Sequence, residues 1–131
     1  MTGVGFLICG LSFVLFPCQA VEEIGTKYIF LPGSTANITW SFTNNISTVL
    51  SRAWFFTSSD GSFNAKRLAI ITNDEEPQID ESGLSGVTVV KPATLILKNV
   101  NQSYDGTYEF FLLALRNSGT FDVRVFIASK F

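Results

Sequence analysis

The residues that could do chemistry are few in this sequence, and their spacing argues against catalysis. The chain of 131 residues contains no histidine, so it lacks the commonest general base and metal ligand. No two carboxylates share one predicted strand face as a catalytic pair. One acidic cluster stands out, at Asp74, Glu75, Glu76, Asp80 and Glu81. Its spacing does not fit a calcium loop, which needs about six to eight oxygen ligands. We therefore predict a solvated acidic loop, no metal site, no cofactor and no enzymatic activity.

Three Asn-x-Ser/Thr sequences are the remaining chemical signal. They are Asn37-Ile38-Thr39, Asn45-Ile46-Ser47 and Asn101-Gln102-Ser103. In a secreted chain each of the three asparagines, Asn37, Asn45 and Asn101, is a candidate N-glycosylation site.

Residues 1–20 have the pattern of a secretory signal peptide. Their apolar stretch, from Gly5 to Phe16, is shorter than the ~20 residues of a membrane span. Cys18 and Ala20 are small residues at the −3 and −1 positions of a cut before Val21. The basic n-region is missing, and the alternative is an N-terminal core strand or helix. With the leader removed, residues 21–131 form one extracellular domain, either secreted or outermost on a cell-surface receptor. Any membrane attachment is expected only through a segment that this chain lacks.

The predicted mature domain has no cysteine, because both cysteines, Cys9 and Cys18, lie in the leader. Small secreted domains usually contain disulfides, so this domain must be held together by packing. Its composition allows that, with 47% hydrophobic and 14% aromatic residues. The net charge of −2 argues against a nucleic acid or an anionic membrane as partner.

Short β-strands with turns between them account for most of residues 21–131. In residues 35–42 the large side chains of Ile38, Trp40 and Phe42 alternate with polar ones, which is the period of a half-buried strand. Further strands are expected at 27–31, 49–57, 67–71, 87–90, 94–97, 107–116 and 120–128, with at most one edge strand in the loop 73–86. About nine short strands predict an all-β sandwich of two antiparallel sheets.

Four sequence features resemble the variable-type (V-set) domain of the immunoglobulin superfamily. They are Gly33 to Trp40 as strand B, Trp54 in strand C, Ala93 to Val100 as strand E, and Asp105-Gly106-Thr107-Tyr108 at the start of strand F. Trp40 and Phe110 stand 70 positions apart where the family has its disulfide cysteines. The resemblance implies an immunoglobulin-like two-sheet Greek-key sandwich of the V type, with about nine strands.

The resemblance also implies an aromatic substitute for the disulfide, made by Trp40, Trp54, Tyr108 and Phe110. A disulfide closing such a loop would contribute roughly 4.5 kcal/mol. Burial of two large aromatic side chains contributes about 1.5–3 kcal/mol each, so the exchange is nearly even. The predicted core is Ile38, Trp40, Phe42, Trp54, Phe56, Leu95, Leu97, Tyr108, Phe110, Leu112, Phe121, Val123 and Val125.

One departure concerns Asp105. The family's acidic residue at this turn would stand at position 104, which is Tyr104 here, and its usual arginine partner is missing near residues 84–87. We expect that salt bridge to be absent, or Asp105 to serve another purpose such as capping the turn.

Strand alternation turns several apolar side chains outward on the sheet that the family calls GFCC′. The predicted partner-binding residues are Phe55, Glu109, Phe111, Leu113, Leu115 and Phe126. A contiguous apolar patch on an outer face indicates an interface. The alternative is that Phe111 and Leu113 are covered by the segment 73–86 or by a neighbouring domain.

The resemblance thus implies an extracellular recognition or adhesion module that binds itself or another cell-surface protein through this sheet. Self/non-self recognition, as in invertebrate allorecognition receptors, is one specific form. The alternative is a secreted ligand-binding or decoy domain that acts through its loops. The F–G loop around 116–119 is short, which weakens that alternative.

Overall fold

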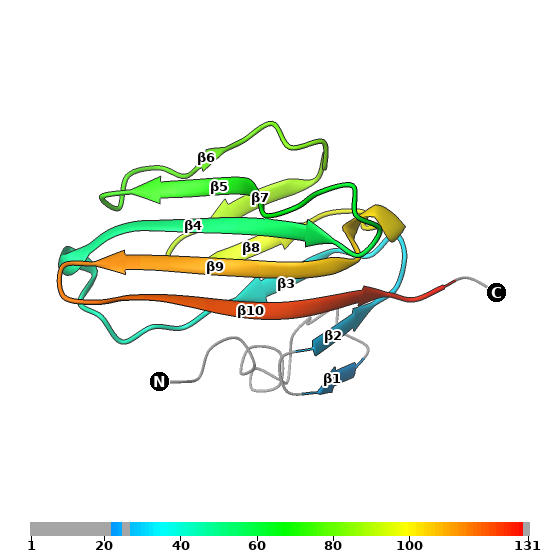
Figure 1. Ribbon diagram of the computed structural model, residues 1–131, viewed down its shortest axis with the longest axis horizontal. Coiled ribbons are helices and arrows are strands. Elements are labelled where there is room, and N and C mark those ends of the chain that lie inside the picture. Colours follow the sequence, from blue (N-terminus) through cyan, green and yellow to red (C-terminus); the bar gives the residue numbers. More distant parts are fainter. Residues whose placement is uncertain (1–21, 25–26, 130–131) are drawn as a thin grey trace.

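The computed structural model describes residues 22–24 and 27–129, with side chains from residue 27 onward. The predicted leader, 1–20, lies outside the described residues. The described chain forms two β-sheets packed face to face (Figure 1), which confirms the predicted all-β, immunoglobulin-like sandwich. Within the described part, no helix is long and apolar enough to cross a membrane.

The larger sheet has seven strands in the order β1-β2-β10-β9-β4-β5-β6. They span Glu22–Ile24, Lys27–Phe30, Ser118–Ile127, Gly106–Ala114, Val49–Ser58, Lys66–Thr72 and Gln78–Ile79, respectively. β2 runs parallel to β10, and the other neighbours are antiparallel. β10, β9, β4 and β5 thus take the places expected for strands G, F, C and C′.

The smaller sheet has three strands in the order β3-β8-β7, which span Ala36–Thr39, Thr94–Leu97 and Val87–Val90. Two short 3-10 helices, η1 (Ile46–Thr48) and η2 (Gln102–Tyr104), precede β4 and β9. β3 is shorter than the predicted strand 35–42. After Trp40, whose N–H donates to the carbonyl of Ala93, the chain leaves the sheet, and the ring of Phe42 packs 6.3 Å from that of Phe110.

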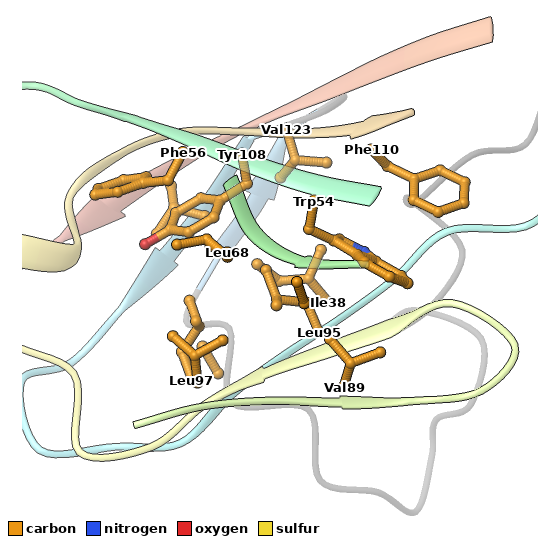
Figure 2. Packing of buried hydrophobic residues seen from close by; sticks show 14 of the residues in the cluster. Ile38, Trp54, Phe56, Leu68, Val89, Leu95, Leu97, Tyr108, Phe110 and Val123 are labelled. Atoms are coloured by element: carbon orange, nitrogen blue, oxygen red, sulfur yellow. The ribbon is translucent and has the colours of Figure 1, made fainter. Parts of the chain in front are cut away.

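The hydrophobic core fills the space between the two sheets (Figure 2). All of the predicted core residues are buried except Phe42 and Phe121, which are half-buried and pack against the core. The sequence analysis did not list Tyr28, Phe30 and Ile71, which are fully buried.

Leu68 enters the core through a β-bulge. Trp54 pairs with Ala69, while the next residue, Phe55, pairs with Arg67, so Leu68 is the extra residue in β5. A bulge interrupts strict alternation of faces. Leu68 is therefore fully buried and points toward the ring of Tyr108 (Figure 2), on the same side as Ala69.

The turn before β9 is held by Tyr108. Its hydroxyl donates a hydrogen bond to the carbonyl of Tyr104 at 2.6 Å, and burial raises the pKa of this phenol well above its usual value. Tyr104 in turn accepts a hydrogen bond from the N–H of Gly86 in the other half of the sandwich. The predicted tyrosine corner thus joins the turn to both sheets.

Asp105 has a charged partner that the sequence analysis did not find. Its carboxylate lies 3.0 Å from the guanidinium of Arg124 in β10 and also accepts the N–H of Ile127. No salt bridge joins Asp105 to residues 84–87 among the described residues, as expected, and Asp105 instead pairs with Arg124. This partner comes from β10, which is adjacent to β9 in the sheet, and not from residues 84–87.

Candidate protein-binding surface

The outer face of the seven-stranded sheet, which is the face turned away from the core, is set by the register of its central strands. Trp54 of β4 pairs with Phe110 of β9, and both side chains are buried, so the neighbouring positions on each strand face outward. Three successive cross-strand rows cover this face. In the order β5, β4, β9, β10 they are Thr72–Ser51–Leu113–Ser118, Ile70–Ala53–Phe111–Thr120 and Arg67–Phe55–Glu109–Asp122.

The middle of this face is apolar. We define the apolar patch as Ala53, Phe55, Ile70, Phe111 and Leu113. Phe55, Ile70 and Phe111 are half-buried among their neighbours, Leu113 is 38% exposed, and Ala53 is buried beneath the larger side chains around it. Polar side chains are expected on the solvent side of an isolated antiparallel sheet. The structure therefore brings together three of the predicted partner-binding residues, Phe55, Phe111 and Leu113, and adds Ile70 and Ala53.

Charged side chains border the patch, with opposite signs on its two sides. On the β5 side Arg67 forms an ion pair with Asp80 at 2.6 Å, and this carboxylate raises the pKa of the guanidinium. Glu109 lies in the same row on β9, and Asp122 lies beyond it on β10. The row thus runs from a cation through Phe55 to two carboxylates.

Two predicted partner-binding residues lie away from this centre. Leu115 follows the end of β9 and is 65% exposed, and its N–H donates to the carbonyl of Thr48. Phe126 lies beyond the end of β9, since Gly106, the first residue of β9, pairs with Val125. Its ring is covered by the guanidinium of Arg124, 4.0 Å from the ring centroid, so Phe126 does not extend the apolar patch.

The segment 73–86 extends the sheet at its edge. Its strand β6 pairs with β5, with Ile79 opposite Ala69 and Gln78 opposite Ile70. Leu84, farther along the segment, is buried in the core, and Figure 1 shows β6 beside β5, with the segment running on toward β7. Leu113 stays exposed on the central strands.

The four predicted disulfide-replacing residues are all buried in the core, and Trp40, Trp54 and Phe110 are in ring contact there. The ring of Phe110 stacks on Trp40 at 5.5 Å between centroids and lies 5.2 Å from Trp54. Tyr108 stacks on Phe56 at 4.5 Å. The indole N–H groups of both tryptophans are buried without a hydrogen-bond partner among the described residues, so these rings contribute through apolar burial.

Arg52 is a buried cation that the sequence analysis missed. It is 0% exposed, and its guanidinium donates to the carbonyl of Pro92 at 2.9 Å and to the carboxylate of Asp74 at 2.7 Å. Lys91 also approaches Asp74, at 3.7 Å. Arg52 holds the pKa of the Asp74 carboxyl below its usual value, with a smaller contribution from Lys91. Strand alternation could have predicted that Arg52 is buried, because it lies two residues before the inward-facing Trp54 in β4.

The acidic cluster of the sequence separates in the structure. Asp74 pairs with Arg52 and Asp80 with Arg67, whereas Glu75, Glu76 and Glu81 are exposed. No group of three or more metal-ligating side chains occurs in residues 22–24 and 27–129. One hollow at the loop end of the sandwich, beside Asn44 and Asn117, encloses about 130 Å³. Wider hollows of about 390, 400 and 570 Å³ lie beside Pro32 and Asn101, beside Trp40 and Pro92, and along Ile79 to Val87.

The three sequons lie on different elements. Asn37 is in β3, on the outer face of the smaller sheet, Asn45 directly precedes η1, and Asn101 directly precedes η2. None of them lies on the outer face of the larger sheet.

Comparison with known proteins identifies the fold alone. No family model and no curated protein matches this sequence. Among solved structures, the chain is similar to the V domain of amphioxus IgVJ-C2, with a TM-score of 0.58 and 13% sequence identity. The match covers 77% of this chain and 99% of that one. With the two-sheet topology, this similarity shows that residues 27–129 form an immunoglobulin-like sandwich.

Proposed function

We propose that this chain is an extracellular recognition module of the variable type, which binds a second copy of itself through the outer face of its larger sheet. The apolar patch is the observation that carries this proposal. It lies on β4, β5 and β9, strands that the core already fixes from the other side, so it is rigid before binding. A preformed apolar centre with a charged rim is typical of protein interfaces.

The charges favour a second copy as the partner. A two-fold axis parallel to the strands would place β5 of one copy over β10 of the other. Arg67 would then face Asp122 on both sides of the apolar centre, so the surface is complementary to itself. The side chain of Arg67 remains 46% exposed in its pair with Asp80, which leaves part of it accessible.

Sedimentation of the full chain, from micromolar to near-millimolar concentration, tests this proposal. Phe111→Glu places a charge in the centre of the patch and should abolish the dimer. Val90→Glu is the matched control, because Val90 is 52% exposed on the other sheet. A dimer lost only in Phe111→Glu supports the proposal. A chain that stays monomeric throughout would overturn self-binding and leave a different surface protein as the partner.

A further inference from the structure

Two of the three sequons share one local geometry. The side-chain oxygen of Asn45 accepts hydrogen bonds from the N–H and the hydroxyl of Ser47, at 3.0 and 2.9 Å. The side-chain oxygen of Asn101 accepts the same pair from Ser103, at 2.8 and 2.5 Å. In each case the asparagine binds the serine of its own sequon.

This geometry leaves the amide nitrogen, the atom that would carry a glycan, available at both sites. Asn45 and Asn101 are exposed, and neither amide nitrogen donates a hydrogen bond within the described residues. Bulky N-linked glycans require such a surface position. In the folded chain both sites therefore have room for a sugar without a change in the backbone.

The third sequon is part of a packed sheet. Asn37 pairs with Ile96 of β8, is half-buried, and has a buried side-chain oxygen without a partner among the described residues. The hydroxyl of Thr39, the third residue of this sequon, lies 2.7 Å from that of Thr94 on the neighbouring strand. A glycan on Asn37 would have to fit over the side chains beside it.

We infer that Asn45 and Asn101 are the N-glycosylated residues of this protein, and that Asn37 is occupied to a much smaller extent. The two glycans would lie at opposite ends of the sandwich, because η1 precedes the start of β4 and η2 lies beside its end (Figure 1). Both positions leave the apolar patch uncovered. The inference concerns modification and does not depend on self-binding.

Site-resolved glycopeptide mass spectrometry of the full chain, expressed in a eukaryotic secretory cell, tests this inference. Enzymatic deglycosylation in heavy-oxygen water marks each formerly occupied asparagine. We expect high occupancy at Asn45 and Asn101 and low occupancy at Asn37. The inference would be overturned if Asn37 were occupied as fully as the other two sites, or if Asn45 or Asn101 were unmodified. A chain without any glycan would also overturn it.

Sequon variants provide an independent readout by gel mobility. Asn45→Gln and Asn101→Gln should each remove one glycan, and the double variant should migrate like the enzymatically deglycosylated chain. Asn37→Gln is the matched control and should leave the mobility unchanged. A shift with Asn37→Gln equal to that of the other two would contradict the assignment.

Discussion

At the scale of single residues, this domain is stabilised by buried contacts that do not depend on a disulfide. Phe110 contacts three aromatic rings, those of Trp40, Phe42 and Trp54, and is fully buried. Arg52 adds a polar connection, since it lies on a strand of the larger sheet and donates to Pro92 between β7 and β8 of the smaller one. Both residues thus join the two sheets.

Phe110→Ala should lower the free energy of unfolding by about 3–5 kcal/mol, because it leaves a cavity between Trp40 and Trp54. Phe110→Leu should cost less, since it keeps most of the volume. Urea unfolding followed by circular dichroism measures both changes. Leu113→Ala, on the surface, is the control and should stay within about 0.5 kcal/mol of the wild type. A Phe110→Ala protein as stable as the wild type would rule out the aromatic substitute.

Asp74→Asn should destabilise the protein at neutral pH and have less effect in acid. The folded-state pKa of Asp74 is lowered from its ordinary value of 3.8, chiefly by the hydrogen bond from Arg52. A carboxylate with a lowered pKa stabilises the fold above its unfolded-state pKa, and this contribution is lost as the pH falls through the folded-state pKa. The stability difference between wild type and Asp74→Asn should therefore shrink below about pH 4. Urea unfolding across pH measures it, and a difference that is constant with pH would contradict the role of the charge.

At the scale of elements, the central strands β4 and β9 approach closely where the turn before β9 ends. A Cβ atom on Gly106 would lie 2.3 Å from the carbonyl oxygen of Thr57 and 2.9 Å from the Cα of Ser58. Both atoms belong to the backbone of β4, so they cannot rotate away. This glycine therefore sets the spacing at that end of the sheet, beside the turn held by Tyr108 and Asp105.

Gly106→Ala should destabilise the fold by about 1–3 kcal/mol through this overlap. Amide hydrogen exchange should increase first at Thr57, Ser58 and Thr107, where the two strands separate. The control is Gly61→Ala in the β4–β5 turn, where φ is +84° and an added Cβ meets no atom within 4 Å. That change adds backbone strain of about 1–2 kcal/mol without a steric overlap between strands. If amide hydrogen exchange at the end of β4 were unchanged in Gly106→Ala, the two strands would accommodate the added methyl group without loss of stability. That result would contradict the prediction.

At the scale of the whole molecule, the two outer faces differ in character. The face of the larger sheet has an apolar centre between Arg67 and Asp122. The face of the smaller sheet carries Asn37, Thr39, Thr88 and Thr94 on its strands, with Ile96 half-buried among them and Val90 exposed beside Thr94. This asymmetry is what selects the larger sheet for self-binding in the proposed function.

Exchanging the charges of Arg67 and Asp122 should distinguish self-binding from binding of a different protein to this face. Arg67→Glu and Asp122→Arg should each weaken the dimer by up to about thirtyfold, since each change removes both symmetry-related ion pairs and an exposed ion pair contributes at most about 1 kcal/mol. The double variant should recover part of the lost affinity, because the opposite charges face each other again. Sedimentation gives the three dimer constants. A double variant weaker than both single variants would exclude the two-fold arrangement with β5 over β10.

The sequence by itself determined the fold class, most of the strands and nearly all of the predicted core. These follow from local signals, since strand alternation repeats every two residues and places Ile38, Trp40, Trp54 and Phe110 on inward faces. The parity of β4 and β9 likewise gave Phe55, Phe111 and Leu113 as outward residues. The sequons, too, could be read directly.

Only the tertiary structure decided which of these residues are neighbours. The bulge at Leu68, the Arg124 partner of Asp105 and the contacts of Arg52 depend on strand register and on loops that are distant in the sequence. Strand pairing also placed Ile70 in the apolar patch, because it lies opposite Ala53. It excluded Phe126, because that residue lies beyond the end of β9. The partial burial of Asn37 and the exposure of Asn45 and Asn101 also depended on the packed sheet, because the same Asn-x-Ser/Thr pattern lies in different surroundings.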